Sequence, residues 1–158
     1  MRTEPEMERA IARYADMVRR ICFLHVYDHF DTEDLFQTVF LKYALYPGEF
    51  REEEHEKAWL IRVTLNACND LKRRWSRRPT TPLEAIEELP AESTEQRDVL
   101  SAVLALPPKY RDAIYLHYYE GYPVARVAEI MRQKENTVSS WLMRGRDKLR
   151  ESLKGESL

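Results

Sequence analysis

The sequence is poor in glycine and cysteine and lacks any long apolar run. Only four of its 158 residues are Gly, and no segment shows the strict alternation of apolar and polar residues that predicts a half-buried strand. No apolar run approaches the ~20 residues that a membrane span needs. Residues 1–9 are acidic and polar, without the apolar segment of a secretion signal. The composition therefore predicts a helical, cytoplasmic protein that does not insert into a membrane.

The cysteines and histidines give no sign of a metal or catalytic site. Cys22 and Cys68 fall within helical patterns, so we expect reduced thiols in a protein core. No Cys and His pair has metal-ligand spacing, which predicts that there is no metal site and no cofactor. An enzyme is the least favoured class of function, because no carboxylate or Cys is placed to complete a catalytic set with His25, His29, His55 or His117.

The small net charge of −2 conceals blocks of opposite sign. Residues 57–78 hold seven basic residues and one acidic residue, whereas residues 79–99 hold six acidic residues and one basic residue. Residues 1–56 are acidic on balance and residues 100–154 are basic. Nucleic-acid binding depends on local rather than total charge, so two basic segments separated by an acidic one are compatible with DNA binding.

Apolar residues at helical spacing predict helices in the first half of the chain at residues 7–27, about 31–46 and about 57–75. Asp31 is the expected N-cap of the second helix, which should stop before Pro47 and Gly48. An exposed acidic loop is expected at residues 49–56.

The third predicted helix carries one continuous polar row opposite its apolar face. An Asn side chain can both donate to and accept from a base edge, and cations can hold phosphates. A row of this kind can also be a solvated helix face, but Asn is a mediocre helix former and two of them favour a binding role. The row consists of Arg62, Asn66, Asn69 and Arg73, with Lys72 and Arg74 beside it.

An acidic segment punctuated by proline separates the two halves of the chain. Residues 77–95 are predicted to form a linker, with one helical turn at about 83–89. Helices are expected at about 94–105 and 109–120, the second ended by Gly121, then at 124–131 and from an Asn136 N-cap to about 154. The predicted architecture is all-α, with two small helical domains at about 1–76 and 96–158.

The last two predicted helices form a helix-turn-helix, the arrangement with which many proteins enter the DNA major groove. An ordinary helical hairpin with a solvated basic face is the simpler alternative. Short hydroxyls and long cations on the second helix favour contact with base edges and phosphates. These outward residues are Thr137, Ser139, Ser140, Met143, Arg144 and Lys148.

Three segments in this order resemble bacterial RNA polymerase sigma factors. Residues 31–42, DTEDLFQTVFLK, resemble the acidic-Leu-x-Gln-x-x-Phe helix of region 2, and residues 59–74, WLIRVTLNACNDLKRR, resemble the helix that follows it. Residues 106–111, LPPKYR, and residues 136–150 resemble region 4. The short linker is similar to that of the extracytoplasmic-function (ECF) group.

The resemblance implies a non-enzymatic transcription factor with three contact surfaces and no cofactor. The face of Asp34, Gln37, Thr38 and Leu41 would dock on core RNA polymerase. The third helix and the loop before it would open the −10 promoter element and hold a flipped base, through Arg62, Asn66, Asn69, Asp70, Arg73 and Arg74. Region 4 would bind the −35 element through Thr137, Ser139, Ser140, Met143, Arg144, Arg146 and Lys148. An anti-sigma factor is a further expected partner.

The sequence departs from the family pattern in two of these surfaces. Thr38 stands where the polymerase contact usually has Glu, and the helix-turn-helix turn has Arg132 and Gln133 where Gly and an apolar residue are usual. Two alternatives stay open beside the sigma factor. One is a stand-alone DNA-binding regulator that uses only the second half, and the other is a polymerase-binding protein that has lost promoter recognition.

Overall fold

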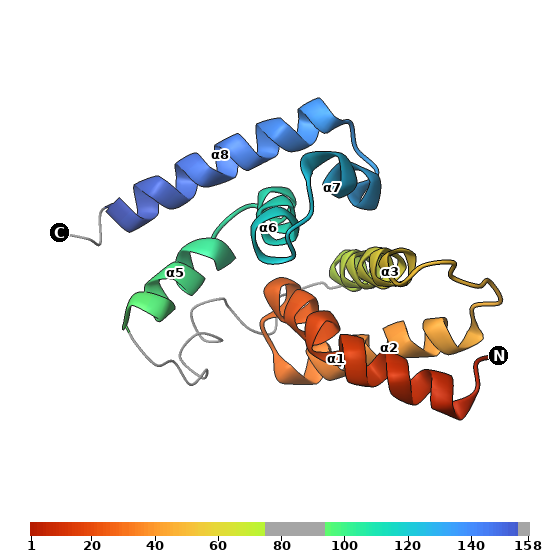
Figure 1. The fold of residues 1–158 in the computed structure, drawn as a ribbon. Helices are drawn as coiled ribbons and strands as arrows, with labels where there is room; N and C mark the ends of the chain where they lie inside the picture. The colour runs from red at the N-terminus through yellow and green to blue at the C-terminus, as the bar shows by residue number, and fades with distance from the viewer. Residues whose placement is uncertain (75–93, 155–158) are drawn as a thin grey trace. The chain divides into compact units, whose positions relative to one another are not determined.

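The computed structural model describes residues 1–74 and 94–154, with side chains of the second range from residue 98 onward (Figure 1). The chain divides into two compact units, Met1–Thr80 and Thr81–Leu158. The described residues are helical and contain no strand, which confirms the all-α prediction. The predicted turn at 83–89 and most of the predicted linker lie outside the described residues.

The first unit is built from helices α1 (Glu4–Val26), α2 (His29–Leu45) and α3 (Glu53–Arg74), each of which packs against the other two (Figure 1). Its core is formed by apolar side chains that are wholly removed from solvent, among them Val18, Val39, Leu60 and Ile61. Cys22 and Cys68 are also buried, and they are not joined in a disulfide. Burial of this apolar surface is the main stabilising term of a bundle of this size.

The break between α1 and α2 is shorter than the sequence pattern suggested. Tyr27 ends α1 in a left-handed conformation at φ 57°, and Asp28 follows as the N-cap of α2. The Asp28 carboxylate accepts from the Asp31 backbone N–H at 3.4 Å, so the prediction of Asp31 as the cap is wrong. Two aspartates three residues apart both suit a cap, and the earlier one is used because His29 and Phe30 are already helical.

Helix α3 begins four residues earlier than predicted, at Glu53 rather than at about Lys57. The second half of the expected acidic loop is therefore the first turn of this helix. That turn contains Glu53, Glu54 and Glu56, whose negative charge interacts favourably with the amino-terminal end of the helix dipole. The acidic residues thus have a local role in helix stability.

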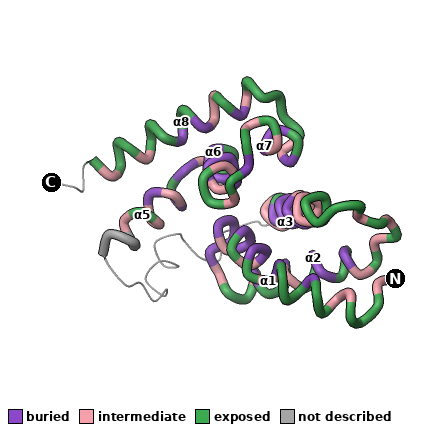
Figure 2. The backbone as a smooth tube through the Cα atoms, viewed as in Figure 1, coloured by how far each residue is buried: buried purple, intermediate pink, exposed green. Residues whose placement is uncertain are grey.

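The second unit contains α5 (Thr94–Leu104), α6 (Pro108–Ile114), a π-helical turn η1 (Tyr115–Tyr119), α7 (Val124–Met131) and α8 (Glu135–Lys154). Helix α8 packs against α5, α6 and α7. Buried and exposed positions follow one another along α8 with helical periodicity (Figure 2). A Cβ atom added to Gly145 of α8 would lie 3.0 Å from Ile114 Cγ1, so Gly145 permits the close approach of α6 and α8.

The predicted helix 109–120 changes its form halfway along. Its first part is α6, but Tyr115–Tyr119 form a π-helical turn, in which the Glu120 N–H donates to Tyr115 O at 3.1 Å. Gly121 follows with φ +79° and ends the segment, as predicted.

The helix-turn-helix is formed by α7 and α8. The turn places Arg132 in the left-handed region, at φ 55° and ψ 49°, and the Gln133 N–H donates to Ala128 O at 2.9 Å. Helix α8 begins at Glu135, and the Val138 N–H donates to Lys134 O at 3.1 Å. Asn136 therefore lies inside the first turn and is not the N-cap that the sequence suggested.

None of the described helices has an apolar stretch that would reach across a bilayer.

Candidate nucleic-acid interface

The polar row of α3 lies on the surface of the first unit. Asn66, Asn69 and Arg73 are exposed, and Arg62 is half-buried. Arg73 forms an ion pair with Asp70 on the same helix. An open hollow is lined by Asn66, Asn69, Asp70, Lys72 and Arg73. The fold thus presents amide, carboxylate and cationic groups together on one face.

A buried histidine lies behind this row. The Nδ1 atom of His25, on α1, lies 2.8 Å from Lys72 Nζ, and His25 is wholly buried. A lysine ammonium can only donate, so Nδ1 accepts and the ring proton is on Nε2. The contact fixes Lys72 at the edge of the row. Nothing in the sequence pattern indicated this contact, because it joins residues 47 positions apart.

One face of α2 presents both polar and apolar side chains to solvent. Asp34, Gln37 and Thr38 are exposed, and the Thr38 hydroxyl donates to Asp34 O at 3.0 Å. Leu41 is 60% exposed. Phe30 and Leu45, at 83% and 59% exposed, continue the same face at steps of four residues. Sequence reasoning missed these two, although their helical spacing from Asp34 and Leu41 was visible.

The outer face of α8 has two edges, since residues two apart on a helix point about 200° from one another. On one edge, the guanidinium of Arg144 hydrogen-bonds Tyr110 and, with Lys109 and Lys148, lowers the pKa of that phenol. Lys109 Nζ lies 5.5 Å from the centre of the Tyr110 ring and 5.7 Å from that of Trp141. Positive charge is therefore concentrated where α6 meets α8.

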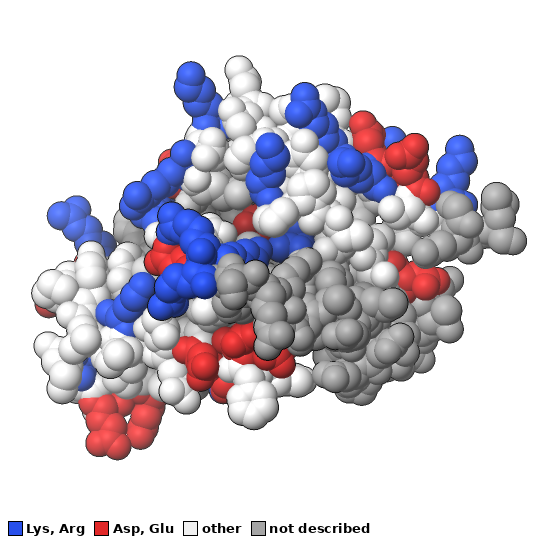
Figure 3. Space-filling model, turned by 180° about the vertical axis from the view of Figure 1, so that it is seen from behind, with Lys and Arg blue, Asp and Glu red and all other residues white. Residues whose placement is uncertain are grey.

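The other edge of α8 faces the π-helical turn. Arg146 Nη1 donates to the Tyr118 hydroxyl at 2.6 Å, and both side chains are exposed. Met143 on this side is 53% exposed, Ser139 is exposed, and Thr137 and Ser140 are half-buried. On the face drawn in Figure 3, several Lys and Arg side chains lie close to one another, with acidic side chains beside them.

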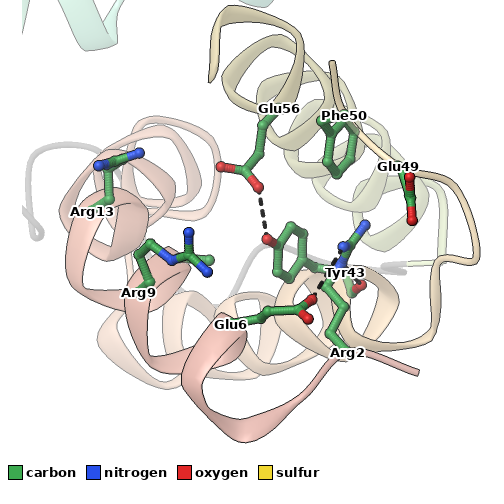
Figure 4. A pocket seen from close by; sticks show the side chains of 9 residues that line it. Arg2, Glu6, Arg9, Arg13, Tyr43, Glu49, Phe50 and Glu56 are labelled. Atoms are coloured by element: carbon green, nitrogen blue, oxygen red, sulfur yellow. Dashed lines mark hydrogen bonds and ion pairs between the residues drawn. The ribbon is translucent and has the colours of Figure 1, made fainter. Parts of the chain in front are cut away.

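An aromatic cluster surrounds the loop between α2 and α3. Trp59 lies 4.7 Å from the Tyr46 ring and 5.6 Å from the Phe50 ring, measured between centroids. Beside it is a hollow of about 330 Å³ that residues of α1, α2, α3 and the loop line (Figure 4). Sequence reasoning did not select this cluster.

A tyrosine and a glutamate meet at the wall of this hollow. The Tyr43 hydroxyl donates to Glu56 Oε2 at 2.7 Å (Figure 4). Burial raises the pKa of Tyr43 to about 12, and the hydrogen bond to Glu56 and its negative charge act in the same direction. Within the described ranges, no three His, Cys, Asp or Glu side chains cluster as metal ligands.

The chain matches models of two protein regions. Residues 10–78 match the model "Sigma-70 region 2", and residues 96–149 match "Sigma-70, region 4". The chain is 33% identical over 123 residues to the ECF RNA polymerase sigma factor SigM of Mycobacterium tuberculosis, covering 75% of this chain and 62% of that protein. It is 28% identical over 145 residues to SigM of Bacillus subtilis, covering 87% of this chain and 88% of that protein. The chain thus spans about three fifths of the length of the mycobacterial relative.

Two solved structures share the fold. One is the sigma factor RpoE in complex with the anti-sigma factor NepR from Bartonella quintana, with a TM-score of 0.72 and 21% identity over 94% of this chain and 97% of that chain. The other is CnrH in complex with the cytosolic domain of CnrY, with a TM-score of 0.70 and 22% identity over 97% of this chain and 90% of that chain. Region 2 and region 4 models in order, together with these relatives, show that the chain belongs to the sigma-70 family of RNA polymerase sigma factors, in its ECF group.

Proposed function

We propose that this protein binds core RNA polymerase and directs promoter recognition and DNA opening at the start of transcription. The observation that carries the proposal is that one chain has two exposed polar and basic surfaces of different composition on separate units. One is the amide-rich row of α3, and the other is the cationic outer face of α8 in a helix-turn-helix. A protein that bound only duplex DNA would need only the second.

The α3 row suits a strand that has been opened. Asn66 and Asn69 are exposed, and each can donate to and accept from the edge of an unpaired base. Arg73, Arg74 and Lys72 supply positive charge for the phosphates of the same strand, while Arg62 and Asp70 complete the row. We propose that this row and the loop before α3 hold the −10 element and its flipped base.

The outer face of α8 suits the major groove of duplex DNA. Ser139, Ser140 and Thr137 lie in its first turns, where a recognition helix meets base edges. The longer side chains farther along are suited to phosphates or base edges; they are Met143, Arg144, Arg146 and Lys148. We propose that they bind the −35 element and set the register of the α3 row on the promoter.

The exposed face of α2 is the proposed contact with core polymerase. It combines Asp34, Gln37 and Thr38 with solvent-exposed Leu41, to which Phe30 and Leu45 add apolar surface. Exposed apolar side chains aligned on one helix are typical of a protein interface.

The proposed division of labour assigns −10 opening and polymerase binding to residues 1–76 and −35 binding to residues 96–158, with residues 77–95 as the acidic linker. Tethering lets both units engage one promoter and raises the effective concentration of the second contact. The two solved relatives are complexes with an anti-sigma factor or with the cytosolic domain of CnrY, which supports a protein inhibitor as a further partner. The proposed role is non-catalytic and is carried out in the cytoplasm, where the polymerase is.

Transcription by purified bacterial core polymerase on a library of genomic promoter fragments tests this function. With the chain added, we expect new start sites that share one −10 and one −35 element. No new start sites with intact core binding would instead favour a polymerase-binding protein without promoter recognition. No start sites and no core binding would favour a stand-alone DNA-binding regulator.

A further inference from the structure

Arg2 ties the beginning of the chain to the loop between α2 and α3. Its backbone N–H donates to Ala44 O at 3.0 Å, its Nε donates to Tyr43 O at 3.0 Å and its Nη2 donates to Gly48 O at 2.9 Å. The side chain is only 11% exposed. A single residue thus holds three carbonyl groups more than 40 positions away along the chain.

Two of these carbonyls belong to the end of α2. The last four C=O groups of a helix have no partner within that helix and need donors from elsewhere. Tyr46 follows α2 with extended backbone, and its N–H donates to Tyr43 O at 3.3 Å. Arg2 provides further donors to Tyr43 and Ala44, and through Gly48 it extends the same hydrogen-bonding network into the loop.

The same guanidinium lies against two aromatic rings, one on α2 and one in the loop. Its carbon atom lies 4.4 Å from the centre of the Tyr43 ring and 5.1 Å from that of the Phe50 ring (Figure 4). An ion pair between Arg2 and Glu6, at 3.7 Å, orients it on the first turn of α1. The Phe50 ring stacks on the Tyr46 ring, at 5.5 Å between ring centres. Arg2 therefore also restrains Tyr46, through Phe50.

We propose that Arg2 is a positioning residue for promoter opening: it holds the loop at residues 46–52 in one conformation before DNA arrives. The proposal rests on the proposed function, in which this loop and α3 hold the opened −10 strand. A loop that becomes ordered only on binding loses affinity to the entropy of ordering, whereas a loop held in advance does not. Only a planar fork with several donors can bridge Tyr43 O and Gly48 O while it lies on two aromatic rings.

Hydrogen exchange of the full chain tests whether Arg2 holds the loop. In Arg2→Ala, we expect the amides of residues 43–52 to exchange about tenfold faster, because two side-chain hydrogen bonds to carbonyls are lost. Arg2→Lys should show most of this effect, since a single ammonium cannot replace the fork. Exchange in the middle of α1, at residues 14–22, should stay unchanged and shows that the unit remains folded.

Arg19→Ala is the matched control. Arg19 lies on α1, and its Nε donates to Glu33 Oε1 at 2.8 Å. Its guanidinium lies 4.0 Å from the centre of the Phe36 ring. It therefore joins α1 to α2 by an ion pair and an aromatic contact, but it does not contact the loop. Its removal should leave exchange at residues 43–52 unchanged.

The second measurement is the rate of open-complex formation with core polymerase on a promoter that the wild-type chain uses. Arg2→Ala should slow opening several-fold without weakening binding to −35 duplex DNA, and Arg19→Ala should alter neither. Unchanged loop exchange in Arg2→Ala would overturn the proposal. Faster loop exchange with a normal opening rate would also overturn it, because the loop would then not need to be held. If the wild-type chain supports no transcription, the proposed function and the promoter role of Arg2 both fail, while the exchange data still decide whether Arg2 holds the loop.

Discussion

Arg146 of α8 donates a hydrogen bond to the hydroxyl of Tyr118 in the π-helical turn, at 2.6 Å. The bond fixes the direction of a long cationic side chain that would otherwise sample many rotamers, and so lowers the entropy cost of a phosphate contact. Tyr118→Phe should therefore weaken binding to a −35 duplex about twofold to fivefold. Fluorescence anisotropy with a labelled duplex measures the affinity.

Because Tyr118 is 55% exposed, Tyr118→Phe should not alter the unfolding free energy of the protein. Tyr119→Phe is a suitable control, since Tyr119 lies next to it, is 62% exposed and stacks on Tyr115 at 5.2 Å between ring centres. Equal affinities for Tyr118→Phe and the wild type would show that orienting the Arg146 side chain through Tyr118 does not contribute to DNA binding.

The exposed face of α2 should govern binding to core polymerase. The double variant Asp34→Ala and Gln37→Ala removes two exposed polar groups, so it should leave the fold intact and weaken binding to core at least about tenfold. Co-purification with tagged core polymerase, followed by titration, measures the loss. Glu8→Ala, an exposed position on α1, serves as the control. Undiminished core binding by the double variant would show that this face of α2 does not contact core polymerase.

Asn66→Ala should separate DNA opening from duplex binding. A lost contact to a base edge costs about 1–3 kcal/mol, so opening should slow about tenfold while affinity for the −35 duplex stays within about twofold. Arg144→Ala should weaken binding to the −35 duplex and leave the rate of opening of bound promoter unchanged, because Arg144 lies on the helix-turn-helix. Stopped-flow detection of strand separation and anisotropy with duplex DNA give the two values. Equal losses in both assays would show that Asn66 contacts only phosphates.

The hydrogen bond from Tyr43 to Glu56 should make stability depend on pH in the alkaline range. The folded-state pKa of Tyr43 is about 12 against the ordinary 10.0, so the neutral phenol is favoured in the folded protein. Its contribution is complete below pH 10 and is lost as the pH rises through 12, by about 3 kcal/mol in total. Tyr43→Phe should unfold more readily at neutral pH but show a shallower decline above pH 10.

Urea unfolding of both proteins between pH 8 and pH 11 measures this difference. Some decline should remain in Tyr43→Phe, because burial also raises the pKa of Tyr14. Parallel curves for the two proteins over the whole range would show that Tyr43 does not carry the effect.

The helices were predictable where local chemistry alone determines them. Pro123 precedes α7, and strong amphipathic spacing follows it, so the bounds Val124–Met131 agree with the prediction. At α2, Asp28 and Asp31 both suit a cap, and sequence alone could not rank them. At α3, the acids from Glu53 onward have the composition of a loop but stabilise the first turn of a helix.

The contacts that organise the surfaces depend on tertiary structure and could not be predicted. Arg2 reaches Gly48 across 46 positions, and Lys72 reaches His25 across 47. The π-helical turn after α6 also has no local signal, because helical propensities do not distinguish π from α hydrogen bonding. Residue types and helical spacing therefore give candidate faces, whereas the long-range contacts beside those faces emerge only from the fold.

Substitution of Arg132 should show how much backbone strain is present in the turn between α7 and α8. Its backbone is left-handed, at φ 55° and ψ 49°, a conformation that costs a residue with a Cβ about 1–2 kcal/mol. Glycine adopts it freely but loses more entropy on folding, so Arg132→Gly should stabilise the second unit by about 0.5–1 kcal/mol. Arg132→Ala should not, because alanine retains the strain. Hydrogen exchange of the amides of residues 124–150 in increasing urea measures the stability of the second unit in both variants.

Gln133→Gly is the control, since Gln133 does not have positive φ and a glycine there should only destabilise. Arg132→Gly should bind the −35 duplex nearly as well as the wild type, because the Gln133 to Ala128 hydrogen bond that shapes the turn uses backbone atoms alone. A destabilised Arg132→Gly would mean that the exposed Arg132 side chain stabilises the turn by more than its backbone strain costs. In that case the contacts of the Arg132 side chain would outweigh the strain of its backbone. The affinity of Arg132→Gly for DNA should then fall together with its stability.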